Sequence, residues 1–202
     1  MVYGKTISMK KLSTYLFLVL FSFSTPSFAD DIRDFQIGGI SVGDSLLDYF
    51  SEEEINKQKK TFYPSKKFYV MYLPYVFDLG SYEDIDVSIK NNDQKYTIYS
   101  IGGTIFFQNN INECYKKKDE IEKELSEIFK DVARKDDVGN FTMNADISGK
   151  SIATTVNFVF DSGDFISIQC IDWSKKMNLP DNLGVSIVTN EYNEFTLNEV
   201  YK

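Results

Sequence analysis

One amphipathic segment constrains the fold of this chain more than any other feature. Between Ile111 and Val132, apolar residues recur at spacings of three, seven, four, three and four, and lysines and glutamates fill the positions between them. This spacing is typical of a long helix with one buried stripe. The segment lies between two groups of strand-like stretches. We therefore expect an α+β fold, with helices packed on one face of a mostly antiparallel sheet.

The strand-like stretches are recognised by alternation of apolar and polar residues. In the clearest case Ile85, Val87 and Ile89 alternate with residues that include Asp84 and Asp86, which predicts a strand with one solvent-exposed face. We predict strands at residues 67–73, 82–89, 95–107, 151–160, 165–173 and 184–189. Turn residues at 90–94 and 161–164 predict two hairpins. The pair Gly102 and Gly103 predicts a bulge or bend.

The segment before the first strand predicts two short helices. Asp44 is suited to cap the first, and a Ser51 to Glu54 capping box begins the second. The expected order is helix, helix, three strands, helix, three strands, with a helical turn in the tail at 190–202. We expect one domain over residues 30–202, and the repeated order leaves open a division into two structural halves, 30–108 and 109–202.

Residues 1–29 predict an export signal. Lys10 and Lys11 precede a short apolar run, and Ser27 and Ala29 occupy the −3 and −1 positions of a peptidase site. We expect cleavage after Ala29, with translation starting at either Met1 or Met9. The alternative is a buried N-terminal helix. No cysteine directly follows the cleavage site, so we expect a soluble periplasmic protein without a lipid anchor or membrane span.

Composition excludes several classes of function. The chain has no histidine, so a Ser-His-Asp triad, a Cys-His dyad and an imidazole metal site are all excluded. Removing the signal takes away three of the 22 basic residues and none of the 30 acidic ones, and the net charge moves from −8 to −11. An acidic domain repels nucleic acid. No cofactor or metal site is indicated, and the lack of a catalytic motif argues against an enzyme.

The two cysteines are expected to form a disulfide. Cys114 lies on the apolar stripe of the long helix, and Cys170 lies in a strand that this helix would cover. An oxidising compartment favours a bridge between them. The alternative is two buried free thiols, which pack like small apolar residues.

Aromatic residues between 62 and 77 are denser than a single strand requires. Tyrosine and phenylalanine rings are favoured at surfaces that bind a partner. We therefore predict a contact surface that consists of Tyr63, Tyr69, Tyr72, Tyr75, Lys66 and Lys67. The alternative is that the alternating rings pack beneath the helices.

Acidic residues offer weaker candidates. A hydrolase needs only two carboxylates in contrasting environments. However, helix capping explains Glu52, Glu53 and Glu54, and a solvent-exposed strand face explains Asp84 and Asp86. The turn at 161–164 lacks the spacing of a calcium loop.

The opening of the mature chain supports a resemblance. Its run F-x-I-x-G-I-S-V-G-D-S-L-L-D-Y-F at residues 35–50 resembles the opening of a group of small, uncharacterised, signal-bearing periplasmic proteins of AT-rich marine bacteria. The segment at 39–49 is also loosely similar in layout to the BamE-type outer-membrane assembly subunit and the beta-lactamase-inhibitor protein. These resemblances imply a small helix-plus-sheet module and imply no activity. The missing lipid-anchor cysteine departs from the assembly-subunit pattern.

We infer an exported module that binds an unidentified protein or small molecule. A small carboxylate-dependent hydrolase of the periplasm and a structural envelope protein are the alternatives.

Overall fold

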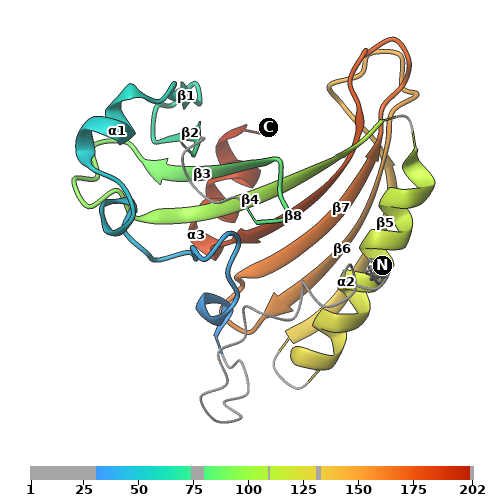
Figure 1. Cartoon of the computed structure of the whole chain (residues 1–202), viewed down its shortest axis with the longest axis horizontal. Helices are drawn as coiled ribbons and strands as arrows, with labels where there is room; N and C mark the ends of the chain where they lie inside the picture. The colour runs from blue at the N-terminus through green and yellow to red at the C-terminus, as the bar shows by residue number, and fades with distance from the viewer. Residues whose placement is uncertain (1–30, 74–79, 109, 131–132, 201–202) are drawn as a thin grey trace, which may run out of the picture.

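The protein is built around one eight-stranded antiparallel sheet. The computed structural model describes residues 31–73, 80–108, 110–130 and 133–200 (Figure 1). The strand order is β1-β2-β3-β4-β8-β7-β6-β5. The strands are β1 (Thr61–Phe62), β2 (Phe68–Tyr72), β3 (Asp84–Lys90), β4 (Ile98–Phe107), β5 (Ala133–Thr142), β6 (Ile152–Phe160), β7 (Phe165–Asp172) and β8 (Asp181–Val188). The α+β class and the antiparallel sheet are as predicted.

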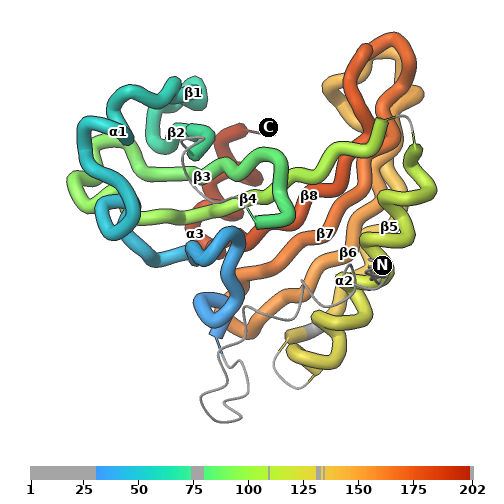
Figure 2. Tube along the Cα trace, viewed as in Figure 1, coloured from blue at the N-terminus to red at the C-terminus, as the bar shows by residue number. Residues whose placement is uncertain are grey.

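Two meanders of four strands each make up this sheet. In Figure 2 the first meander runs from cyan to green and the second from yellow to red. They join where β4 pairs with β8, in a register that places Gly102 opposite Ser186. The predicted hairpins at residues 90–94 and 161–164 connect β3 to β4 and β6 to β7.

Within the described residues, three α-helices accompany the sheet, namely α1 (Glu52–Lys57), α2 (Ile111–Ile128) and α3 (Asn190–Phe195). The predicted capping box at the start of α1 is confirmed, because Ser51 accepts a hydrogen bond from the Glu54 backbone and the Glu54 side chain accepts one from the Ser51 backbone. Short 3-10 turns lie at Ile32–Asp34 and Leu46–Asp48, and a π-helical turn follows α3 at Thr196–Val200. No helix within the described ranges is both long and apolar enough to cross a bilayer.

The main core lies on the face of the sheet that α2 covers, here called the α2 face. This face carries the apolar side chains of alternate strand residues, which include Ile85, Val87, Ile101, Ile168 and Ile187. Helix α2 packs against β7 and β8, and residues 32–57 contribute buried side chains to the same core.

The prediction that all helices pack on one face is wrong for α3. Tyr192 and Phe195 of α3 pack with Phe68 of β2 in a separate cluster, against Tyr99 and Val188. Val188 follows Ile187 in β8, and successive strand residues point to opposite faces. Helix α3 therefore lies on the reverse side, here called the α3 face.

The structure also has four strands in each meander, where the sequence predicted three. The missed strands are β1, which has only two residues, and β5, which forms one edge of the sheet. Strand β5 carries charged residues and a bulge between Asp137 and Gly139. An edge strand needs no continuous apolar face, and charges and bulges protect it from pairing with other chains. Its alternation is consequently too weak to predict a strand.

The glycine pair in β4 does not form the predicted bulge. Gly102 and Gly103 pair in regular register with Asp86 and Ile85. The register shifts instead opposite Ser88 and Ile89 of β3, where Tyr99 is the extra residue of β4. A Cβ atom on Gly103 would lie 2.5 Å from the ring of Tyr82. Glycine is favoured at these two positions because the side chains of Asp86 and Tyr82 pack closely against the backbone of β4.

Candidate functional site

An open pocket of about 280 Å³ lies where the β3–β4 hairpin meets the segment after α1. We call it the hairpin pocket, and its lining residues are Glu52, Lys60, Phe62, Tyr69, Asn91, Asn92, Asp93, Gln94 and Tyr96. Aromatic rings, planar amides, two acids and one lysine therefore converge from α1, from β1 and the residue before it, from β2 and from the β3–β4 hairpin. Pockets that combine apolar surface with a few placed polar groups are the usual sites of ligand binding.

The hairpin turn that forms one wall is fixed by Asp93. Its carboxylate accepts hydrogen bonds of 2.9 Å from the backbone N–H groups of both Lys95 and Thr97. Burial opposes ionisation of this carboxyl, but the two backbone hydrogen bonds outweigh it and hold the pKa of Asp93 below its ordinary value. Asp93 is thus an ionised structural group whose oxygens are already occupied.

Lys60 is the cation of the hairpin pocket. Its ammonium group lies 5.1 Å from the centre of the Tyr69 ring and 5.7 Å from that of Tyr96, and it is 3.0 Å from Oδ1 of Asn56. Cation–π contacts of this kind hold a lysine in place without neutralising its charge. Within the described part of the chain, Lys60 forms no ion pair with a carboxylate.

The other acid of the pocket is also engaged. The Tyr96 hydroxyl donates a 3.0 Å hydrogen bond to Oε1 of Glu52. Burial, followed by this hydrogen bond, raises the pKa of Tyr96. Burial raises the pKa of Tyr69 to about 12, so both phenols are neutral at physiological pH. Lys60 is therefore the group in this pocket that is available to bind an anion.

The residues predicted as a contact surface do not form one surface in the structure. Tyr69 is buried beside the hairpin pocket, whereas Tyr72 is 60% exposed and belongs to the α3 face. The Tyr63 hydroxyl lies 2.6 Å from that of Tyr192 in the α3 cluster. Alternate residues of a strand point to opposite faces, which divides the aromatic segment between two sides of the sheet.

The remaining predicted residues flank these positions. Lys66 is exposed in the β1–β2 turn, with a positive φ of 57°. Lys67 forms an ion pair of 3.4 Å with Glu199 and lies over the Phe195 ring. Tyr75 lies outside the described residues. The sequence analysis did not identify Lys60 as a site residue, and it interpreted residues 90–94 only as a turn.

The α3 face holds an unexpected acid. Asp86 was predicted to lie on a solvent-exposed strand face, but it is partly buried above Gly102, where a Cβ atom would lie 3.1 Å from Oδ1 of Asp86. Burial, together with the negative charge of Asp84, raises the pKa of Asp86 to about 6. The solvent-face explanation is therefore wrong for Asp86, and its carboxyl has no hydrogen bond or ion pair within the described residues.

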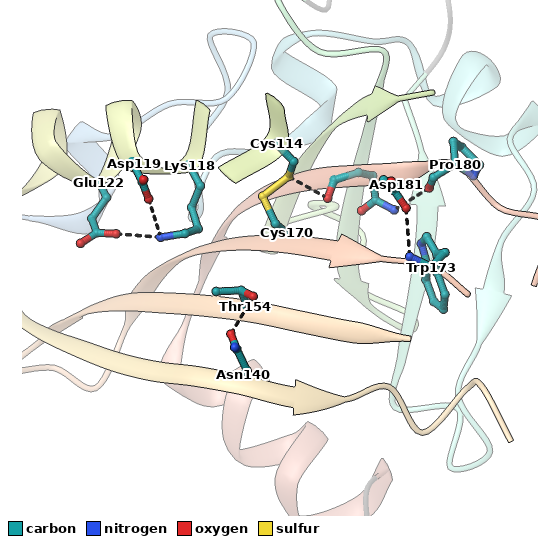
Figure 3. The surroundings of a disulfide bond; sticks show 11 residues. Cys114, Lys118, Asp119, Glu122, Asn140, Thr154, Cys170, Trp173, Pro180 and Asp181 are labelled. Atoms are coloured by element: carbon teal, nitrogen blue, oxygen red, sulfur yellow. Dashed lines mark hydrogen bonds and ion pairs between the residues drawn. A yellow bond between two sulfur atoms is a disulfide. The ribbon is translucent and has the colours of Figure 1, made fainter. Parts of the chain in front are cut away.

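The predicted disulfide is present. Cys114 of α2 and Cys170 of β7 are bonded, with their Cα atoms 6.0 Å apart (Figure 3). Both side chains are fully buried in the core of the α2 face. One turn further along α2, Lys118 pairs with Glu122, which also pairs with Lys135 of β5. Helix α2 is thus connected to the sheet by the disulfide and by the ion pair of Glu122 with Lys135.

The residues that the structure describes contain no cluster of potential metal ligands. Across 31–73, 80–108, 110–130 and 133–200, no three acidic or cysteine side chains come close enough together to hold an ion. Both cysteines are consumed by the bridge. Comparisons with protein-family models, with curated proteins and with solved structures give no match.

Proposed function

We propose that this chain is an exported binding module, and that its contact surface is the hairpin pocket. The observation that carries this proposal is Lys60, a lysine held over two tyrosine rings, while Glu52 accepts a hydrogen bond from Tyr96 and Asp93 accepts two from the backbone of the hairpin turn. This chemistry favours a ligand or partner segment that presents a carboxylate or another anion beside an aromatic or aliphatic group. The exposed Phe62 ring extends the apolar part of the surface.

A pair of matched fragments tests the pocket. We expect 3-phenylpropanoate to bind about fivefold more tightly than its uncharged amide, because an exposed ion pair contributes about 1 kcal/mol. Binding is measured from shifts of the backbone amide signals of Asn91, Asn92 and Gln94 by NMR. Lys60→Met should remove the preference for the acid, and Lys60→Arg should keep it.

Lys66→Met is the matched control, because Lys66 is an exposed lysine that does not line the pocket. It should leave the preference for the acid unchanged. Equal binding of acid and amide to the unmodified protein would count against the pocket, as would an equal effect of the two lysine substitutions.

Export to the periplasm is part of this proposal, supported by the signal-like sequence and by the disulfide. The resemblance of residues 35–50 to small periplasmic proteins points the same way. We expect protein recovered from the periplasmic fraction to begin at Asp30 and to be two hydrogens lighter than its reduced form. Intact mass spectrometry checks both. Full-length, reduced protein in the cytoplasmic fraction would contradict export.

A carboxylate-dependent hydrolase is the second candidate function. It is favoured by one observation, the raised pKa of Asp86 beside a second acid, Asp84. An enzyme of this kind would lose turnover in Asp86→Asn, while fragment binding at the hairpin pocket would be unchanged. A binding module would show the opposite dependence, on Lys60 and not on Asp86.

A further inference from the structure

Two loops project together from the end of the sheet that lies away from the hairpin pocket. They connect β5 to β6 (residues 143–151) and β7 to β8 (residues 173–180), and we call them the hairpin tip. Figure 1 shows both at the upper right, beyond the strand ends. The backbone N–H of Ser174 donates a 2.9 Å hydrogen bond to Oγ of Ser151, which links the two loops.

The first loop is held rigid by a buried carboxylate. Asp146 accepts hydrogen bonds from the backbone N–H and hydroxyl of Ser148, at 2.9 Å each, and from those of Ser151, at 3.0 Å and 2.7 Å. Ile147 lies directly beside this carboxylate in the chain and is fully exposed. An ordered loop that holds a large apolar side chain in water is typical of a contact surface.

The hairpin tip combines apolar and cationic side chains. Leu179 in the second loop is 47% exposed, so each loop presents one aliphatic side chain to solvent. Three exposed lysines surround them, namely Lys150, Lys175 and Lys176. Within the described residues none of the three forms an ion pair.

The acids within the two loops and at the strand ends that adjoin them are partly or fully removed from solvent. Asp146 and Asp181 are buried, and Asp172 is partly buried. The Asp181 carboxylate accepts a hydrogen bond from the Trp173 backbone (Figure 3). The exposed charge of the tip is therefore positive, on a chain whose net charge is −8.

We propose that the hairpin tip docks the protein on a lipid surface with anionic headgroups. Ile147 and Leu179 would enter the interface, and the three lysines would remain at the level of the headgroups, as amphipathic side chains do. Two exposed aliphatic side chains are too few for a stable protein interface, which buries about 800 Å² on each partner. The partly buried Trp173 at the base of the tip suits the interfacial level, where tryptophan is enriched.

Docking at this end leaves the hairpin pocket accessible. The pocket lies near Ile98, where β4 begins, and the tip lies near Asp181, which pairs with Phe107 where β4 ends. The proposal does not depend on what the pocket binds.

Vesicle binding by the full mature protein, with its disulfide intact, tests the proposal. We expect the protein to co-sediment with vesicles that contain phosphatidylglycerol at low salt. It should not co-sediment with these vesicles at high salt, or with vesicles of phosphatidylcholine alone. Trp173 is the only tryptophan of the chain, so a blue shift of its fluorescence reports contact directly. Replacing Lys175 and Lys176 by glutamine should weaken partitioning about 25-fold, since each lysine near an anionic surface contributes about fivefold. Ile147→Ser should weaken it about tenfold.

Leu197→Ser is the matched control, because Leu197 is an exposed leucine in the turn after α3, 56% accessible and outside the tip. It should bind vesicles as the unmodified protein does. The proposal is overturned by no binding to anionic vesicles, by equal binding to phosphatidylcholine, or by equal weakening in Leu197→Ser and Ile147→Ser. Binding to soluble polyglutamate as strong as to vesicles would indicate an acidic protein partner and would also overturn it.

Discussion

Replacing Cys114 and Cys170 by alanine should lower the free energy of unfolding by about 4 kcal/mol. The bridge joins residues 56 apart in the sequence, and the chain-entropy relation for a loop of this length gives about 4 kcal/mol. The link connects α2 to β7, so its loss also allows α2 to separate from the sheet before the strands unfold. Denaturant unfolding of the oxidised, reduced and doubly substituted proteins measures the effect.

The reductant itself supplies the control. The doubly substituted protein should unfold at the same denaturant concentration with and without reductant, and the reduced protein should resemble it. Alkylation followed by mass spectrometry verifies that both thiols are free in the reduced sample. If the oxidised and reduced proteins had equal stability under those conditions, the bridge would not stabilise the fold.

The elements that the sequence predicted well are those that bury a regular stripe. Helix α2 places Cys114, Ile121 and Leu125 on one side, and β3 alternates Ile85, Val87 and Ile89, so in both the periodicity of the apolar residues is that of the element. The short helix α1 was recognised from local capping chemistry. These signals lie within a few residues of one another and need no knowledge of the tertiary structure.

The features that were missed depend on contacts between distant residues. Lys60 acquires its role only when β1–β2 and the β3–β4 hairpin bring Tyr69 and Tyr96 beneath it. The aromatic segment was recognised as unusual, but it was treated as one surface, although alternation sends Tyr69 and Tyr72 to opposite faces. The alternation of polar and apolar residues in β3 correctly predicts that Asp86 and Ile85 point to opposite faces of the sheet. It cannot show that a helix covers the face with the polar residues.

That polar side becomes partly buried because α3 occupies the reverse face of the sheet. The pKa of the Tyr192 phenol is raised mainly by burial and next by its contact with Tyr63. The negative charge of Asp86 raises it further, so Tyr192 and Asp86 lie close together. Asp84 lies two residues away on the same side of β3. The ionised form of Asp86 therefore loses hydration and is repelled by the negative charge of Asp84. Within the described residues no hydrogen bond or ion pair offsets this cost.

Asp86→Asn should consequently stabilise the protein at neutral pH. The pKa of Asp86 rises from its ordinary value of 3.8 to about 6 on folding, so the folded state binds the proton more tightly than the unfolded state. Stability is then highest below the unfolded pKa, falls as the pH rises through the folded pKa, and stays low above it. The full difference corresponds to at most about 3 kcal/mol at neutral pH. Asparagine keeps the shape of the side chain but cannot ionise.

Unfolding measured across this pH range gives a definite signature. The gain of Asp86→Asn over the unmodified protein should be large at neutral pH, shrink as the pH falls through about 6 and vanish below 3.8. Asp84→Asn is the control, because it removes only the neighbouring charge, which contributes less to the shift than burial does. A gain for Asp86→Asn that persists at acid pH would mean that the carboxyl destabilises by its packing and not by its charge. A loss of stability at neutral pH would mean that the carboxylate has a favourable partner when it is ionised.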